Sequence, residues 1–325
     1  MNTLDNQYKA LLLDILENGV KKRTRNGEVL SVFGRQIRHS MKDGFPLLTT
    51  KKMAWDSIKT ELLWFLKGRT DLRWLLENGN SIWVGDAYRR FKNSFAVNLQ
   101  DTVCSLEEFV ELIKTNDKFA QKWGDLGPIY GHQWRNYNGR SIFNRITNES
   151  TTLKTGIDQI KNVIDQLIND PDSRRILVTA WNPEQVDEMV LPPCHYGFQL
   201  YTRELTSDDF LKGDQKFSPT RGLSLMWSQR SVDVPLGLPF NIASYGLLLN
   251  MIADEVRMVP DQLIGNLGDT HIYLNQIDGV KDQLTRKAHP LPQVSVRDGI
   301  YSFGDKDILL KNYVSEPTIK FPLSS

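Results

Sequence analysis

One cysteine lies in a setting that could make it a nucleophile. Cys194 follows Pro192 and Pro193, which restrict the backbone before it, and is followed by His195. A neighbouring histidine or nearby arginines would favour the thiolate, the nucleophilic form of cysteine. Adjacent side chains on a strand point to opposite faces, however, so His195 is a poor direct base for Cys194. The tetrapeptide alone favours a buried structural cysteine beside an unrelated histidine.

Four arginines are candidates for binding a phosphate. Arg23 lies in a polar N-terminal loop, Arg174 and Arg175 follow a turn, and Arg230 ends an expected strand. A guanidinium binds phosphate oxygens through two parallel hydrogen bonds. Each arginine can also be an ordinary solvated charge, and their spacing does not show that the four converge.

Two further patterns offer hydrogen-bonding groups. Asn241 lies at the start of an expected helix, where its carboxamide offers a donor and an acceptor that match the N3–H and O4 edge of uracil. The alternative is a helix-capping asparagine. On a strand, His271 and Tyr273 point to the same face and suit the hydroxyl of a sugar, although both can also be core residues.

A carboxylate opens the apolar segment from Glu61 to Leu66. In a pocket its pKa would rise into the range useful for general acid–base catalysis. An exposed glutamate at a helix start is the alternative.

The composition excludes several classes of protein. The 325 residues include 40 Lys+Arg and 39 Asp+Glu, a formal net charge of +1. This balance argues against a DNA-binding surface and against an electrostatic membrane anchor. Two cysteines do not make a disulfide framework or a four-cysteine zinc site, and we expect no metal. With no signal peptide or 20-residue apolar run in view, we expect a cytoplasmic protein.

Hydrophobic periodicity predicts an α/β fold that positions these residues. A capping box from Ser105 to Glu108 opens one of the helices. We expect a single domain over 1–325, with insertions at about 92–122 and 203–221. The expected helices are 8–17, 55–66, 109–114, 157–168 and 240–256, and the expected strands are 29–37, 176–181, 198–202 and 223–229.

Ten segments, taken in order over nearly the whole chain, carry a resemblance to a known family. They are Leu30–Gly34, Asp43–Lys51, Glu61–Leu66, Asp125–Gly131, Asp172–Arg175, Leu191–His195, Gln229–Asp233, Gly237–Tyr245, Gly268–Tyr273 and Pro317–Ser325. Together they resemble the thymidylate synthase family. The resemblance implies an α/β (α+β) fold with a large mixed β-sheet flanked by helices, and sheets packed across a homodimer interface.

The resemblance also implies a methyltransferase reaction. Deoxyuridine monophosphate (dUMP) is methylated at C5 to dTMP, and 5,10-methylenetetrahydrofolate gives the carbon and a hydride, leaving dihydrofolate. Cys194 would add to C6 of the uracil. Such an addition is needed because C5 is a weak nucleophile until its neighbour is attacked.

The remaining roles follow from the same resemblance. Asn241 would read the uracil, and His271 with Tyr273 would hold the ribose hydroxyl. Glu61, Tyr130 and His195 would organise water and proton transfers. Arg230 would also lower the pKa of the cysteine. The phosphate and substrate site would contain Arg23, Gln229, Arg230 and Ser231, with Arg174 and Arg175 contributed by the partner of a homodimer. Asp233 would bind the pterin ring, and the folate would contact Ile82, Trp83, Leu191, Leu236, Gly237, Phe240 and Leu323.

Three positions depart from the family pattern. Trp83 is followed by Val84, and the second tryptophan usual in this motif is missing. Pro235 stands where a bulky apolar residue is common. The arginine loop is one residue longer than usual, so Arg23 and Arg25 both remain candidates for the phosphate.

Other functions stay open at this point. A dUMP hydroxymethylase would let water attack the methylene and would release tetrahydrofolate; Trp83 and the intact C-terminal tail favour exclusion of water instead. Deoxycytidylate enzymes of this superfamily carry a carboxylate at the position of Asn241, so the asparagine here argues against a cytosine nucleotide as substrate. A non-catalytic nucleotide- or RNA-binding homologue and a Cys-His hydrolase are the remaining alternatives.

Overall fold

The computed structural model describes residues 2–95, 104–144, 149–206, 219–297, 300–301 and 307–322. Leu323 and parts of both expected insertions lie outside this range. The chain divides into two compact units: the first contains Met1–Ala54, Val163–Leu177 and Cys194–Ser325, and the second contains Trp55–Asn162 and Val178–Pro193. The single domain over 1–325 stays a prediction. Within the described residues, no helix has the length and apolarity that crossing a membrane requires.

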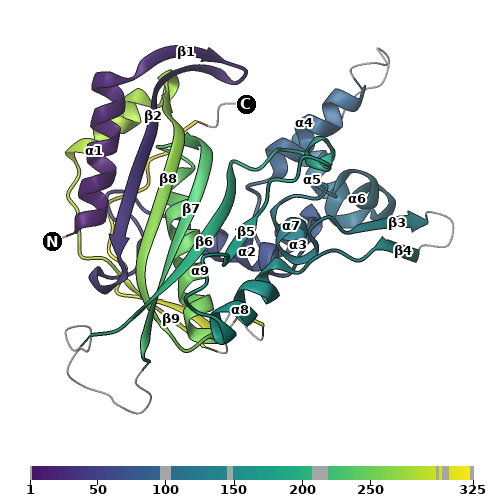
Figure 1. Cartoon of the computed structure of the whole chain (residues 1–325). Coiled ribbons are helices and arrows are strands. Elements are labelled where there is room, and N and C mark those ends of the chain that lie inside the picture. Colours follow the sequence, from purple (N-terminus) through teal and green to yellow (C-terminus); the bar gives the residue numbers. More distant parts are fainter. Residues whose placement is uncertain are drawn as a thin grey trace. The chain divides into compact units, whose positions relative to one another are not determined.

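A six-stranded mixed sheet forms the centre of the first unit (Figure 1). Its order is β1 (Val20–Thr24), β2 (Gly27–Ser40), β8 (Val259–Tyr273), β7 (Arg221–Asp233), β6 (His195–Glu204) and β5 (Leu177–Thr179). The pair β7 and β8 is parallel, whereas β1–β2, β2–β8 and β6–β7 are antiparallel. A separate hairpin pairs β9 (Gln293–Val296) with β10 (Ile308–Lys311). The large mixed sheet confirms the expected fold class.

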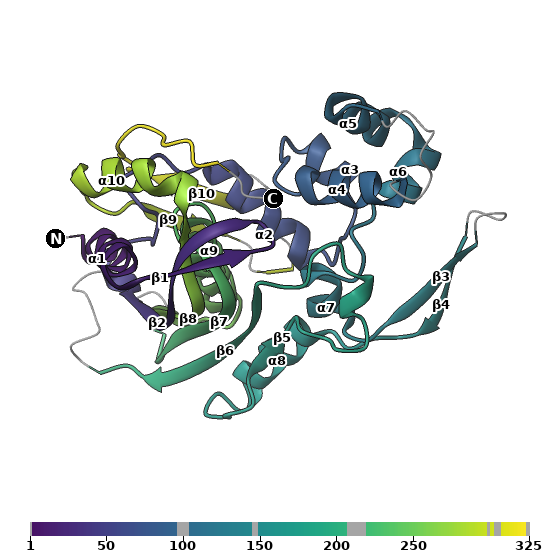
Figure 2. The ribbon, with the colours of Figure 1, turned by 90° about the horizontal axis from the view of Figure 1, so that it is seen from above.

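Helices α1 (Thr3–Asn18) and α9 (Leu238–Glu255) pack on the sheet, α1 against β2 and β8 and α9 against β7 and β8 (Figure 2). α9 is buried along most of its length, which explains why its sequence is apolar on nearly every side. Gly265 on β8 leaves room for the ring of Trp227, since a Cβ there would lie 2.4 Å from it. α10 (Ile277–Thr285) also belongs to this unit, and α8 (Gln159–Asn169) spans the boundary between the units.

The described residues of this unit leave the other face of the sheet uncovered. The register places Gln199, Met226, Ile264 and Arg38 in one row across β6, β7, β8 and β2. This row lines a cavity of 370 Å³, and a second cavity of 540 Å³ lies further along the strands. Large side chains stand exposed on these strands; Phe33 is 79% exposed, Tyr201 64% and Tyr196 41%.

A buried carboxylate ties the start of the chain to a loop that precedes the second unit. Asp5 is fully buried, and it accepts hydrogen bonds from the backbone nitrogen and the hydroxyl of both Thr49 and Thr50. The amide of Asn2 also contacts Asp5. On the other side of the loop, the backbone nitrogen of Glu316 donates to the carbonyl of Thr49 at 2.8 Å. One loop therefore holds both the first helix and the C-terminal segment.

The second unit is mainly helical (Figure 2). It contains α2 (Trp55–Leu66), α3 (Leu72–Glu77), α4 (Val84–Phe95), α5 (Leu106–Thr115), α6 (Asp117–Trp123) and α7 (Tyr130–Asn136), with a hairpin of β3 (Arg140–Asn144) and β4 (Glu149–Lys154). The predicted insertion around 92–122 supplies α5 and α6. The rings of Phe91, Phe109 and Phe119 pack together at centroid distances of 5.1 to 5.7 Å and join these helices to α4.

Most of the expected elements are present with adjusted ends. The capping box is confirmed, and because Ser105 caps α5 this helix begins at Leu106, three residues before the expected start. The strand expected at 176–181 is shorter, because only Leu177–Thr179 pairs. Short 3₁₀ turns occur at Met41–Asp43, Val186–Glu188 and Leu274–Gln276.

Candidate active site

Cys194 lies immediately before β6, and its carbonyl accepts a hydrogen bond of 2.8 Å from the backbone nitrogen of Arg230 on β7. The cysteine is half-buried and the Arg230 side chain is exposed. Pro192 and Pro193 fix the approach of the chain to this strand. The thiol and the guanidinium thus arise from neighbouring strands whose backbones are hydrogen-bonded at this point.

His195 is buried and neutral. Its Nδ1 lies 2.8 Å from the hydroxyl of Tyr245, and the two rings meet edge to face. Burial lowers the pKa of His195 to about 3, because a charged imidazole would lose its hydration. Burial likewise raises the pKa of Tyr245 well above its ordinary value. A pKa of about 3 implies a neutral imidazole over the physiological range.

A chain of hydrogen bonds orients Asn241. The indole nitrogen of Trp227 donates to Oε1 of Gln229 at 3.2 Å, and Nε2 of Gln229 donates to Oδ1 of Asn241 at 3.2 Å. Trp227 is itself fixed by stacking on Tyr245, with 5.3 Å between centroids and 7° between planes. The carboxamide of Asn241, in the first turn of α9, is thereby held with a defined orientation of its donor and acceptor.

His271 and Tyr273 lie on the same face of β8, as alternation predicts. Their rings are perpendicular, with centroids 5.3 Å apart. His271 Nδ1 lies 3.2 Å from the carbonyl oxygen and from Oδ1 of Asp269. The Tyr273 hydroxyl interacts with the side chains of Asn26 and Thr24 at the tip of the β1–β2 hairpin.

Asp233, at the end of β7, is surrounded by donors. Leu236 donates its backbone nitrogen to Oδ1 at 3.1 Å, and Gln276 donates Nε2 to both oxygens at 3.1 and 3.3 Å. Burial nevertheless raises the pKa of Asp233 above its ordinary value, although these hydrogen bonds and the charges of His271 and Lys51 oppose the rise. Leu236, Gly237 and Phe240 follow at the start of α9 and are half-buried.

Lys51 ends the motif Asp43–Lys51, but the sequence predicted no role for its side chain. Its ammonium is buried, donates to the carbonyl of Pro235 and lies 4.7 Å from the ring centroid of Phe321. Burial lowers its pKa to about 8, against the attraction of Asp233. Gln276, which sequence reasoning also missed, donates to the carbonyl of Pro322 at 3.2 Å. Only the folded structure shows these two side chains beside Asp233 and the C-terminal segment.

The candidate phosphate arginines occupy opposite edges of the sheet. Arg23 lies on β1, one edge strand, and Arg25 lies in the turn that follows it. Arg174 and Arg175 precede β5 at the other edge, where the carbonyl of Ile176 accepts a hydrogen bond from Leu200 on β6. Six strands at about 4.8 Å spacing separate the edges by roughly 24 Å. Arg23 therefore does not converge with Arg174 and Arg175 within one chain, and Arg230 lies between these edges on β7.

The second unit holds Glu61, Trp83 and Tyr130 in one cluster. The indole nitrogen of Trp83 donates to Oε1 of Glu61 at 2.8 Å, and the rings of Trp83 and Tyr130 lie 6.1 Å apart, edge to face. Burial raises the pKa of Glu61 to about 7, and the Trp83 hydrogen bond opposes the rise. Of the two alternatives for Glu61, an enclosed carboxylate and an exposed residue at a helix start, the structure has the enclosed carboxylate. Ile82 is 39% exposed and Leu191 is half-buried.

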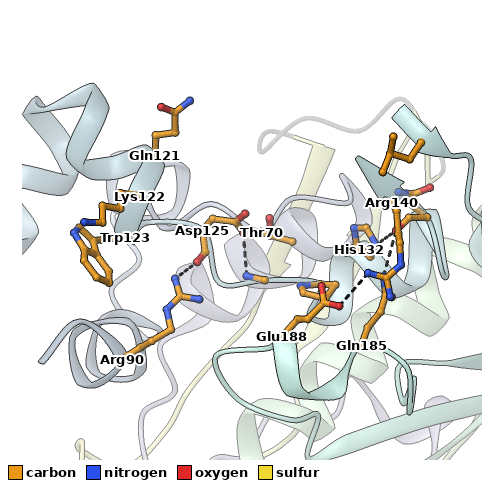
Figure 3. A pocket seen from close by; sticks show the side chains of 15 residues that line it. Thr70, Arg90, Gln121, Lys122, Trp123, Asp125, His132, Arg140, Gln185 and Glu188 are labelled. Carbon is orange, nitrogen blue, oxygen red and sulfur yellow. Dashed lines mark hydrogen bonds and ion pairs between the residues drawn. The ribbon is translucent and has the colours of Figure 1, made fainter. Parts of the chain in front are cut away.

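A cavity of 650 Å³ lies in the second unit between α4, α6, α7 and β3 (Figure 3). Its cationic side chains are engaged: Arg90 donates to the carbonyl of Asp125, and Arg140 forms ion pairs with Glu184 and Glu188. Lys122 lies over the ring of Trp123 at 4.8 Å. The cavity is a polar surface hollow whose lining has three cationic and two acidic side chains.

No group of three or more histidine, cysteine, aspartate or glutamate side chains suited to a metal ion occurs among the described residues. Both cysteines are described, and neither forms a disulfide.

A thiol at a strand start, next to an arginine-bearing strand and an oriented carboxamide, is an arrangement in which a cysteine can act as a nucleophile. Comparison with known proteins narrows this class. The sequence profile of the family described as thymidylate synthase matches residues 6–325. The chain belongs to the thymidylate synthase family.

Curated relatives agree with this assignment. The chain is 41% identical to the thymidylate synthase of Mycoplasma genitalium over 94% of this chain and 96% of the relative. It is 42% identical to that of Mycoplasma mobile and 40% identical to that of Mycoplasma pneumoniae, each over 97% of this chain and 98% of the relative. These relatives support a thymidylate synthase rather than the hydroxymethylase alternative.

Proposed function

We propose that this protein transfers the one-carbon unit and a hydride of 5,10-methylenetetrahydrofolate to C5 of dUMP, giving dTMP and dihydrofolate. The observation that carries the proposal is the placement of Cys194 beside Arg230 at the start of β6, in a chain of the thymidylate synthase family. A guanidinium near a thiol favours the thiolate. Strand β7, which carries Arg230, also carries Gln229, which orients Asn241.

The Cys194 thiolate forms a bond to C6 of the uracil, and the electron pair of the C5–C6 double bond then makes C5 nucleophilic. Asn241 reads the ring edge and stabilises the charge that develops on O4. C5 then bonds to the one-carbon unit and loses its proton as the folate leaves that carbon. Hydride addition to the new carbon re-forms the C5–C6 double bond, and the C6–sulfur bond breaks to restore the thiolate. Glu61 and Tyr130, with the neutral His195, serve the water and proton transfers, and a carboxyl with a pKa of about 7 suits both directions of transfer.

The chemistry of the side chains fits a folate. When bound, the folate supplies the one-carbon unit and the hydride. Asp233 with Gln276 offers a polar anchor for the pterin ring, next to half-buried apolar side chains of α9. The proposed apolar contacts are Ile82, Trp83, Leu191, Leu236, Gly237, Phe240 and Leu323.

We also propose a homodimer in which Arg174 and Arg175 complete the phosphate site of the partner, whose own site contributes Arg23, Arg230 and Ser231. Two observations support this proposal. The arginines lie at opposite edges of the sheet, so a second chain is the simplest source of the missing pair. The uncovered sheet face exposes Phe33, Tyr196 and Tyr201, as a face that is buried on association does. We place the enzyme in the cytoplasm, in line with its near-neutral charge and two cysteines.

The proposal is tested by incubating the protein with dUMP and methylenetetrahydrofolate and measuring the formation of dihydrofolate by its absorbance. Cys194→Ala should lose turnover by about 10⁴-fold or more. Deoxycytidylate should not be a substrate, and release of tetrahydrofolate would instead identify a hydroxymethylase. As an independent test, 5-fluoro-dUMP with the folate should become covalently attached at Cys194, as seen by mass spectrometry of the intact protein and its peptides. No adduct with the wild type would contradict the mechanism.

A further inference from the structure

We propose that Asp269 is a positioning residue that orients the His271 imidazole toward the 3′-hydroxyl of the bound deoxynucleotide. The inference rests on the proposed function, since it takes His271 and Tyr273 as the side chains that hold the sugar. It adds a residue on β8 that the family motifs leave without a role.

The tautomer of His271 follows from its surroundings. Nδ1 faces two acceptors of Asp269, the carbonyl oxygen and Oδ1, each at 3.2 Å. A ring nitrogen between two acceptors carries the proton. In the neutral imidazole Nε2 then keeps its lone pair, so it can accept the hydrogen of a sugar hydroxyl. His271 is 7% exposed, and its ring packs edge-on against Tyr273, which restricts rotation.

The carboxylate of Asp269 is itself held in place. Ser31 donates its hydroxyl to Oδ1 at 2.7 Å, and the Lys22 ammonium lies 3.4 Å from Oδ2. Partial burial alone would raise the pKa of Asp269, but Ser31, His271 and Lys22 outweigh burial and lower it. An ionised acceptor therefore faces His271 at neutral pH.

The same contacts connect the sugar-binding side chains to the β1–β2 hairpin. Lys22 lies on β1 and Ser31 on β2, so Asp269 joins both hairpin strands to β8. Tyr273 is held by Asn26 and Thr24 of the same hairpin. The hairpin that carries Arg23 thus also fixes the geometry at the ribose.

The test compares dUMP with the analogue 2′,3′-dideoxyuridine monophosphate, which lacks the 3′-hydroxyl. Kd and kcat/KM are measured for both nucleotides with the wild type, Asp269→Asn and Asp269→Ala. An asparagine keeps the shape but can turn a donor toward Nδ1. The preference for dUMP is the ratio of the two Kd values, or of the two kcat/KM values, for dUMP and its analogue. We expect this ratio to fall by about three- to tenfold in both variants, which corresponds to the loss of one hydrogen bond. The change should come mainly from Kd and KM, with little change in kcat.

Glu28→Gln is the matched control, because it removes a 3.1 Å ion pair with Lys21 on the same hairpin without contacting His271. This variant should keep the wild-type preference. If the Asp269 variants bind both nucleotides more weakly by the same factor, Asp269 has only a structural role and the inference is wrong. Absence of turnover in the wild type would instead count against the proposed function, and the ratio of the two Kd values would still decide the role of Asp269.

Discussion

The indole nitrogen of Trp83 donates a hydrogen bond of 2.8 Å to the carboxylate of Glu61. Despite this donor, burial keeps the pKa of Glu61 near 7, so the group is about half ionised at neutral pH. A carboxyl in this state can give or take a proton at little cost. It is the titratable group with the clearest consequences for a pH profile.

Glu61→Gln should lower kcat by about 10²- to 10⁴-fold and remove the limb of the pH profile near pH 7. It should also change the pH dependence of stability. The folded state holds the Glu61 proton up to about pH 7, whereas an unfolded glutamate loses it near 4.5. The wild type therefore loses stability as the pH rises through this window, and the variant should lose less, as urea unfolding at pH 5 and pH 8 would measure.

Glu77→Gln provides the control in the same unit, because Glu77 is an exposed residue at the end of α3. It should leave both the pH–rate profile and the pH dependence of unfolding as in the wild type. A wild-type profile without any limb between pH 6 and 8, expected from a pKa of about 7, would contradict this role of Glu61.

Trp83→Phe keeps an aromatic ring but removes the donor to Glu61. Because that hydrogen bond lowers the pKa of Glu61, its loss should move the limb of the pH–rate profile upward by roughly half to one pH unit, the effect of about 1 kcal/mol. Trp74→Phe on α3 is the matched aromatic control and should leave the limb in place. A downward shift with Trp83→Phe would refute the assignment.

His195 should stay neutral from pH 5 to 8, which NMR of its ring signals would establish. Its pKa of about 3 lies below that of an unfolded histidine, so the folded state loses stability as the pH falls below about 6.5, by about 2 kcal/mol at pH 5. Tyr245→Phe removes the hydroxyl at Nδ1 and should cost about 1 kcal/mol in the free energy of unfolding. Tyr137→Phe, at a half-buried tyrosine of the second unit, is the control and should cost much less. A His195 signal that titrates near pH 6 would show that the ring is not enclosed as described.

The uncovered sheet face predicts the outcome of a charge introduced there. Phe33 is 79% exposed in the single chain, so Phe33→Glu should not unfold the protomer but should weaken association by tenfold or more, an expected effect of about 1.4 kcal/mol. Sedimentation velocity over a concentration series measures the change. Leu153→Glu, at a 60% exposed leucine of the second unit, is the control. A wild type that sediments as a monomer at all concentrations would overturn the proposed homodimer.

Local patterns predicted much of this architecture. The long helices α1, α2 and α9 were recognisable because their periodicity lies within one continuous segment, and His271 and Tyr273 share a face because alternation is a property of any strand. Cys194 immediately precedes β6 and Asn241 lies in the first turn of α9, as their motifs indicated. Arg230 was expected to end its strand, but it lies within β7, which continues to Asp233.

Features that depend on contacts between distant segments could not be predicted from the sequence. The separation of Arg23 from Arg174 depends on strand order, which no single segment encodes. The raised pKa of Glu61 depends on enclosure by the surrounding fold, and the position of Lys51 beside Asp233 depends on a loop closing over β7. The short edge strands β1, β9 and β10 also escaped prediction, because four or five residues carry too little periodicity.

The hydrogen bonds that Asp5 receives from Thr49 and Thr50 have a consequence at the far end of the chain. The backbone nitrogen of Glu316 donates to Thr49 of the same loop. Removing the first few residues should therefore destabilise the C-terminal segment around Glu316, more than three hundred positions away in the sequence. An N-terminal truncation would then have the same effect on the C-terminal segment as a mutation within that segment.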